Sequence, residues 1–202
     1  FIAFFIKRSL RCVRIPGFQR ILKNSAKLFP RTAFNDDKAP RAKTAMVGGT
    51  NSRLHHDIQV FWTGEEVCSR EISPGHLKRV SDRLGRKPVL WDNYPVNDGD
   101  RMSQHLHLRA FTGRPAANGA YLSGHGINPA LQPTLTIIPA ITLAESYRQG
   151  TEYQYGQAFQ QAAKEVLGRE LAGQLHADLL VLQDAGLGRI SEEKRQSLMR
   201  TY

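Results

Sequence analysis

The sequence predicts an α/β fold in which a short parallel sheet comes first and an all-helical segment follows. Residues 58–62 and 88–91 are short, nearly continuous apolar runs, which suit strands buried on both faces. A helical pattern lies between them, and strand, helix and strand within about 35 residues form a βαβ unit with parallel strands. Apolar residues then recur at helical spacing from Thr134 onward, which predicts the helical end of the chain.

The helix between the two strands has clear signals at both ends. Ser73 is an N-cap residue, and Pro74 suits the first helical position because its missing N–H would have no partner there. Gly85 can adopt the left-handed conformation that ends a helix. The apolar residues at helical spacing between these ends are Leu77, Val80 and Leu84.

Later elements are predicted in the same way. A third short strand is expected near residues 120–123, ahead of two glycines and an Asn-Pro turn. Helices are expected over 134–147, 158–167 and 171–182. Ser191 then caps a last helix with acids in its first turn and arginines near its end, as the helix dipole favours.

The basic charge of the chain is concentrated in its first quarter. Residues 1–51 hold eleven Lys and Arg against two acids, whereas residues 52–202 hold seventeen against sixteen. Residues 35–56 are rich in turn formers and read as a linker. We therefore predict a poorly ordered basic extension over 1–52, an α/β domain over 53–150 and a helical region over 151–202. The extension is open to three interpretations: an unrelated segment, a targeting segment or an accessory element.

Cysteine content and hydropathy say little about location. Cys12 and Cys68 form no disulfide framework, which weakly favours a reducing compartment such as the cytoplasm. The sequence does not decide the compartment. No apolar run reaches the roughly 18–20 residues that cross a bilayer, so no membrane span is expected.

Three loops with unusual polar content follow the predicted strands. They cover residues 62–69, 91–98 and 124–129 and combine aromatic, amide and carboxylate side chains. In parallel α/β folds, ligands bind at the carboxyl ends of the strands. Tryptophan stacks on the apolar face of a pyranose, and Asn and Asp bind its hydroxyls. Asn and Asp are also common turn formers, and Trp91 could be part of the core, so spacing alone leaves a sugar site only one interpretation.

The sequences of these loops resemble those of glycoside hydrolase family 84, which comprises the O-GlcNAcases and the bacterial β-N-acetylglucosaminidases often labelled hyaluronidases. The likeness covers about 150 residues and is strongest in the octapeptide Trp-Asp-Asn-Tyr-Pro-Val-Asn-Asp at 91–98. Further stretches that carry it are Val60-Phe61-Trp62-Thr63-Gly64, Val67-Cys68-Ser69-Arg70-Glu71-Ile72, Phe111-Thr112-Gly113-Arg114, Asn128-Pro129 and 138–144.

The resemblance implies a fold, a reaction and a set of binding residues. The fold would be the carboxy-terminal half of a (β/α)8 barrel, followed by an α-helical segment. The reaction would be removal of terminal β-linked N-acetylglucosamine from a glycan or glycoprotein, in which the substrate's own acetamido oxygen forms an oxazoline and no cofactor or metal takes part. Asp98 and Asn128 would hold the outer sugar hydroxyls, and Asn93 would lie next to the reacting centre. The walls of the acetamido pocket would come from Trp91, Thr63 and Val67.

One part of the family's pattern is missing. Its catalytic pair is two adjacent aspartates that follow an earlier barrel strand, and the only adjacent pair here is Asp36-Asp37. This pair has no buried strand before it and lies about 25 residues from Trp62, too few for the βα unit that should intervene. We therefore reject Asp36 and Asp37 as catalytic residues and interpret them as a linker turn.

Three functions remain to be compared: a family 84 glycosidase present as a fragment, an inactive remnant with a partial carbohydrate surface, and a nucleic-acid or membrane-surface binder. The third depends only on charge in 1–43, so no nucleic-acid partner is expected. His105-x-His107 has no third metal ligand at suitable spacing and is interpreted as a solvated face, while Cys68 is interpreted as a packed thiol.

Overall fold

The computed structural model describes residues 4–6, 12–14, 58–100 and 102–202. Contacts divide it into two compact units. The first unit comprises Phe1–Asn93 and Gly113–Asn128, and the second comprises Tyr94–Thr112 and Pro129–Tyr202. These two units do not coincide with the domains 53–150 and 151–202 expected from the sequence, which remain a prediction.

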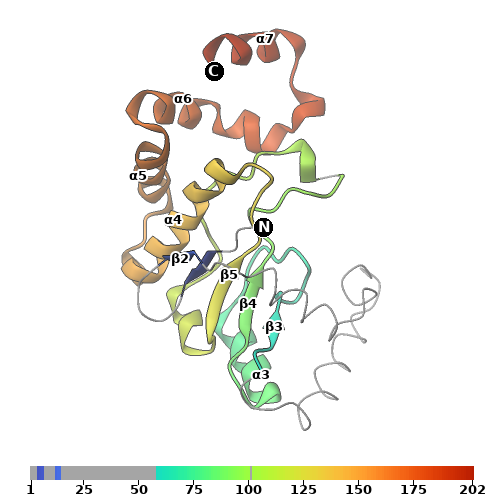
Figure 1. The fold of residues 1–202 in the computed structure, drawn as a ribbon, viewed down its shortest axis with the longest axis vertical. Coiled ribbons are helices and arrows are strands. Elements are labelled where there is room, and N and C mark those ends of the chain that lie inside the picture. Colours follow the sequence, from blue (N-terminus) through green and yellow to red (C-terminus); the bar gives the residue numbers. More distant parts are fainter. Residues whose placement is uncertain (1–3, 7–11, 15–57, 101) are drawn as a thin grey trace. The chain divides into compact units, whose positions relative to one another are not determined.

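The first unit is built on a mixed five-stranded sheet with the order β2-β1-β5-β4-β3. β3, β4 and β5 are parallel neighbours, with Phe61 opposite Val89 and Trp91 opposite Gly126. β1 pairs antiparallel with β5 and with β2, so the sheet continues beyond β5 into the basic segment. Its elements are β1 (Phe4–Ile6), β2 (Cys12–Arg14), β3 (Phe61–Trp62), α3 (Pro74–Leu84), β4 (Val89–Asp92), the 3-10 helix η3 (Ala116–Ala120) and β5 (Gly124–Ile127) (Figure 1).

Helix α3 confirms the predicted end signals. The Ser73 hydroxyl accepts a hydrogen bond from the backbone N–H of His76, and Gly85 adopts φ 61° at the C-cap. The apolar face of the helix packs on the sheet, where it forms a core with strand residues and with Trp62 and Tyr121 at its border. The buried members of this core are Ile72, Leu77, Leu90 and Leu122.

A third parallel strand is present as expected, but the predicted position near 120–123 is wrong. β5 covers Gly124–Ile127, and Ala116–Ala120 forms a 3-10 helix after Pro115. Glycine is disfavoured in strands, but sheet packing overrides this low strand propensity at Gly124 and Gly126. Gly126 lies opposite Trp91, so the small residue leaves room beside the large one.

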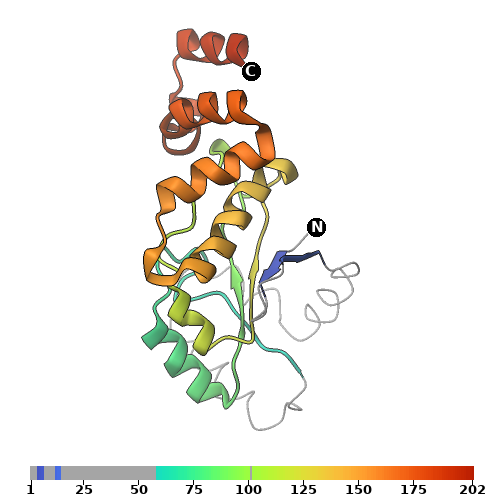
Figure 2. The same ribbon diagram turned by 90° about the vertical axis from the view of Figure 1, so that its left-hand side faces the viewer.

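The second unit is mainly helical. α5 packs against both α4 and α6 (Figure 2), and the core of the unit is formed by alanines and larger aliphatic residues, such as Ala162 and Leu175, together with Phe159. Its elements are η2 (Met102–Gln104), α4 (Pro133–Gln149), η4 (Gly150–Glu152), α5 (Tyr155–Leu167), α6 (Arg169–Leu180), the π-helical η5 (Val181–Ala185), η6 (Leu187–Arg189) and α7 (Glu192–Thr201). The α/β class with helices at the end is therefore confirmed. Within the described residues, no helix combines the length and apolar character needed to span a bilayer.

Candidate functional site

The carboxyl ends of β3, β4 and β5 are joined through the side chain of Asn93. Its Nδ2 donates to the backbone carbonyl oxygen of Val67 at 2.7 Å, which ties the end of β4 to the loop after β3. Its Oδ1 accepts two hydrogen bonds, from Trp91 Nε1 at 3.0 Å and from Asn128 Nδ2 at 3.0 Å. Asn128 follows β5 directly, so one amide connects all three strand ends. Of the residues expected to bind a sugar, the structure thus brings together Trp91, Asn93, Asn128 and Val67.

These contacts fix which hydrogen-bonding groups stay available. A carbonyl oxygen has two lone pairs, and both lone pairs of Asn93 Oδ1 are used by Trp91 and Asn128. Asn93 keeps one N–H, and Asn128 keeps one N–H and its Oδ1, because the described residues provide no further partner for either side chain. Both residues are half-buried. The strand ends therefore offer oriented donors and an acceptor within reach of solvent.

The other two predicted binding residues, Thr63 and Asp98, are not partners in the hydrogen bonds of this amide cluster. Thr63 directly follows β3 and is half-buried. Asp98 belongs to the second unit and is exposed. Its neighbour Asn97 is buried and holds the Asp98 segment by donating to Gln132 Oε1 at 2.9 Å and accepting from the backbone N–H of Leu131 at 2.9 Å. Asp36 and Asp37 lie outside the described residues.

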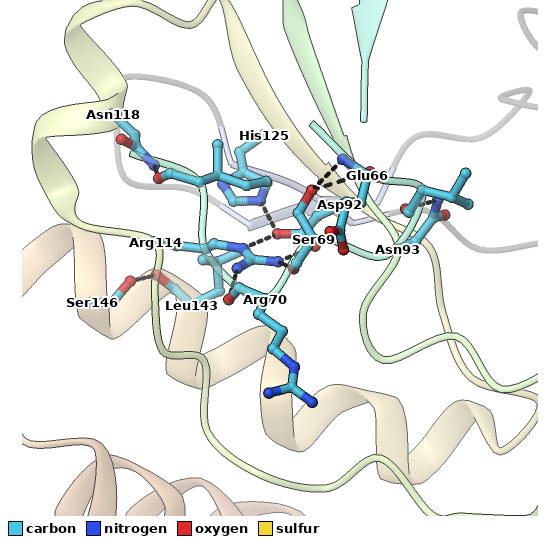
Figure 3. Close-up of polar contacts among 12 residues, drawn as sticks. Glu66, Ser69, Arg70, Asp92, Asn93, Arg114, Asn118, His125, Leu143 and Ser146 are labelled. Carbon is cyan, nitrogen blue, oxygen red and sulfur yellow. Dashed lines mark hydrogen bonds and ion pairs between the residues drawn. The ribbon is translucent and has the colours of Figure 1, made fainter. Parts of the chain in front are cut away.

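A buried charged network lies beneath the amide cluster, and the sequence analysis missed it. Asp92 is the last residue of β4 and only 1% exposed. Its carboxylate accepts two hydrogen bonds from Arg114, from Nε at 2.6 Å and from Nη2 at 2.9 Å, and is contacted by His125 Nε2 at 3.1 Å (Figure 3). Burial raises the pKa of Asp92, but the hydrogen bonds from Arg114 and His125 outweigh it and hold the pKa below its usual value. The carboxylate is therefore ionised at neutral pH.

A signal for this network was present in the sequence. Asp92 directly follows three apolar residues of a buried strand, and a charge in that position needs a partner of opposite charge. What the sequence could not supply is the identity of the partner, which lies 22 residues further along the chain.

Trp62 also has a polar partner. Its Nε1 donates to His76 Nε2 at 2.9 Å, and His76 Nδ1 lies 2.8 Å from Glu65 Oε1. Burial lowers the pKa of His76; Glu65 opposes the shift and Arg79 adds to it. A neutral imidazole fits this geometry because Nε2 must keep its lone pair to accept from the indole.

Two minor interpretations from the sequence are wrong. His105 and His107 do not form a fully solvated face: both are half-buried, and each Nδ1 lies within hydrogen-bonding distance of a backbone carbonyl oxygen, that of Gln183 at 2.7 Å and that of Val96 at 2.9 Å. Cys68 is exposed and not packed. Among the described residues, no group of three or more His, Cys, Asp or Glu side chains is placed to hold a metal ion.

Comparison with known proteins decides the family. The sequence profile of the beta-N-acetylglucosaminidase family matches residues 23–182. The chain belongs to the β-N-acetylglucosaminidase family. The matched range contains all strand-end residues described above and also the pair Asp36-Asp37.

Relatives of this chain carry the O-GlcNAcase name. The protein O-GlcNAcases of Rattus norvegicus and Mus musculus are each 35% identical to it over 96 residues, which is 48% of this chain and 10% of each relative. A variant of the O-GlcNAc hydrolase of Thermobaculum terrenum superimposes with a TM-score of 0.67 and 28% identity, over 84% of this chain and 37% of that chain. This chain therefore spans a small part of these relatives. The resemblance to the O-GlcNAcases found in the sequence is confirmed.

Proposed function

We propose that the ends of β3, β4 and β5 form part of a binding site for a β-linked N-acetylglucosamine residue of a glycan or glycoprotein. The observation that supports this proposal is the fixed orientation of the Asn93 amide by Trp91, Val67 and Asn128. Because its carbonyl is already occupied, Asn93 can only donate, which suits an acetamido or hydroxyl oxygen. Asn128 can both donate and accept, which suits a hydroxyl group.

The reaction in this proposal is the hydrolysis of the glycosidic bond with the substrate's acetamido oxygen as nucleophile. Trp91, Thr63 and Val67 would border the acetamido group, and Asn128 would bind an outer hydroxyl group. The family resemblance assigns the binding of outer hydroxyl groups to Asp98 as well. In this proposal β3, β4 and β5 are consecutive strands of a (β/α)8 barrel. This architecture would explain why polar residues that follow three different strands point to one edge of the sheet.

An alternative is a remnant that binds the sugar without cleaving it. The reason to keep this alternative is that the only adjacent aspartates are Asp36-Asp37, which the sequence does not place after a buried strand. Binding and turnover must therefore be measured separately.

Binding is tested by titrating the 15N-labelled chain with N-acetylglucosamine and, as a control, with glucose. We expect the side-chain amide signals of Asn93 and Asn128 to shift with N-acetylglucosamine and to shift less with glucose. Signals that move equally with both sugars, or with neither, would contradict the proposal.

Turnover is tested with a chromogenic aryl N-acetyl-β-glucosaminide on the same chain. Turnover that is abolished by Asp36→Asn or Asp37→Asn would show that this pair is catalytic after all. Binding without turnover would favour the remnant.

A further inference from the structure

Arg114 uses its whole guanidinium group to join two strand ends. Nε and Nη2 hold the Asp92 carboxylate, while Nη1 donates to the carbonyl oxygen of Arg70 at 2.6 Å and Nη2 to that of Ser69 at 2.7 Å (Figure 3). Asp92 ends β4, and Ser69 and Arg70 belong to the loop after β3. The side chain of Arg114 is 4% exposed, so water does not compete for these hydrogen bonds.

The loop after β3 is thereby held at two neighbouring points. Arg114 fixes the carbonyls of Ser69 and Arg70, and Asn93 binds the carbonyl of Val67 two residues earlier. Asp92, the other partner of Arg114, is the residue directly before Asn93. One guanidinium therefore fixes both the backbone from which the Asn93 side chain projects and the loop that carries its acceptor.

We infer that Arg114 is a positioning residue for the Asn93 amide, and so for the sugar that this amide binds; the second part of this statement rests on the proposed function. Arg114 itself does not contact the sugar and acts through Asn93. It keeps Val67 O at hydrogen-bonding distance from Asn93 Nδ2, which holds the Asn93 carbonyl toward Trp91 and Asn128. Without that acceptor, one of the three hydrogen bonds that orient the amide is lost, and the amide can turn its N–H away from the sugar.

Lysine cannot replace arginine in this role. An ammonium group can stay beside the Asp92 carboxylate, but it is a single point charge and cannot also reach two carbonyl groups in the plane of a guanidinium. The variant Arg114→Lys therefore keeps the buried charge pair and removes the hold on the loop. Arg79→Lys is a matched control, because Arg79 lies in the same unit, is 67% exposed and approaches Glu65 only at 3.9 Å.

The experiment compares wild type, Arg114→Lys and Arg79→Lys by NMR at a temperature at which circular dichroism shows all three folded. We expect Arg114→Lys to shift and broaden the Asn93 side-chain amide signals and to weaken N-acetylglucosamine binding by about tenfold or more, as misplacement of a binding group does. Arg79→Lys should leave both unchanged. A purely structural role would lower the melting temperature without moving the Asn93 signals in the folded state.

Each part can fail separately. Unmoved Asn93 amide signals in Arg114→Lys overturn the positioning role, whether or not the sugar binds. Moved signals with unchanged N-acetylglucosamine affinity overturn its importance for the sugar. A wild-type chain that does not bind N-acetylglucosamine overturns the proposed function, while the amide signals still decide the role of Arg114.

If Arg114→Lys does not fold, the double variant Arg114→Gln with Asp92→Asn replaces it. Removing both buried charges together leaves neither one unpaired, so this protein is expected to fold. It lacks the guanidinium and must give the same shift of the Asn93 signals, and its failure to do so overturns the inference.

Discussion

The side-chain N–H of Asn93 donates to the backbone carbonyl oxygen of Val67 at 2.7 Å, and this contact joins the ends of two parallel strands. The partners are 26 residues apart in the sequence, so the contact exists only in the folded chain. Its direction matters, because the opposite end of the same amide already accepts from Trp91 and Asn128.

The substitution Asn93→Asp is expected to destabilise the fold. A carboxylate cannot donate to Val67 O, so two oxygen acceptors would face each other where a hydrogen bond now exists. We expect a loss of about 1–3 kcal/mol in the free energy of unfolding, the usual cost of leaving a partly buried polar group without its partner. Urea denaturation at pH 7 measures it. The control Gln157→Glu makes the same amide-to-acid change on an exposed position of α5 and should leave stability within about 0.5 kcal/mol.

The substitution Gly113→Ala should destabilise the loop that leads to Arg114. Gly113 has φ +68°, and a Cβ there would lie 2.7 Å from the backbone carbonyl oxygen of Arg70, one of the acceptors of Arg114. The left-handed conformation and the clash together should cost about 1–3 kcal/mol. The melting temperature should fall accordingly, and an unchanged value would show that the loop can shift without cost.

Gly173→Ala is the matched control for Gly113→Ala. Gly173 lies inside α6, and a Cβ there meets no atom within 4 Å. Alanine is favoured over glycine in a helix, so this variant should be more stable than wild type by about 0.5–1 kcal/mol. The two glycine substitutions should thus change the melting temperature in opposite directions.

The sequence was sufficient to predict the parts of the fold that depend on neighbouring residues. Ser73 and Gly85 carry their capping function in their own chemistry, and Ser191 likewise accepts from the N–H of Lys194. The amide cluster was predictable from the rule that parallel strands present their following loops at one edge of the sheet. Packing decides the position of β5. The glycines at 124 and 126 indicated a turn, so the sequence predicted the strand too early.

The buried network was beyond reach of pattern analysis for another reason. Arg114 contacts Asp92, Ser69 and Arg70, and the last two are 45 and 44 residues away. Many arginines of the chain could have been the partner of Asp92, and only the three-dimensional structure selects one. Pattern alone also does not predict that the octapeptide 91–98 is divided between the two units, with Asn93 in the first and Asp98 in the second.

Acidification should weaken the fold through Asp92. The folded-state pKa of Asp92 is depressed below the unfolded value of about 3.9, so the ion pair with Arg114 contributes full stability above that value. This contribution is lost as the pH falls below about 4 and through the folded-state pKa. We expect the unfolding free energy of wild type to decrease in this range.

The double variant Arg114→Gln with Asp92→Asn isolates this effect. Other carboxylates with a lowered pKa, such as Glu145 and Glu192, are present in both proteins and cancel in the comparison. The difference in unfolding free energy between wild type and double variant should be constant above about pH 5 and shift toward the double variant below about pH 4. A difference that is independent of pH would mean that Asp92 has the same pKa in the folded and the unfolded chain, and that Arg114 does not stabilise its charged form.

The indole of Trp62 should report the protonation of His76. Trp62 Nε1 donates to His76 Nε2, so protonation of that nitrogen removes the acceptor and breaks the hydrogen bond. The pKa of His76 is lowered, first by burial and then by Arg79, against the opposing effect of Glu65. The Trp62 indole N–H signal in NMR should therefore change with pH, with a midpoint below about 6.5.

The lowered pKa of His76 also makes the stability of the fold depend on pH. Between the unfolded pKa of about 6.5 and the lower folded pKa, the unfolded chain binds a proton that the folded protein does not, so stability falls as the pH is lowered through this window. His76→Gln should abolish the titration of the Trp62 signal, because the glutamine carbonyl can accept from the indole at every pH. His176→Gln, on an exposed position of α6, should leave the midpoint unchanged. A midpoint above pH 6.5 in wild type would instead mean that the attraction of Glu65 for the imidazolium outweighs burial, and that Trp62 gives up its hydrogen bond near neutral pH.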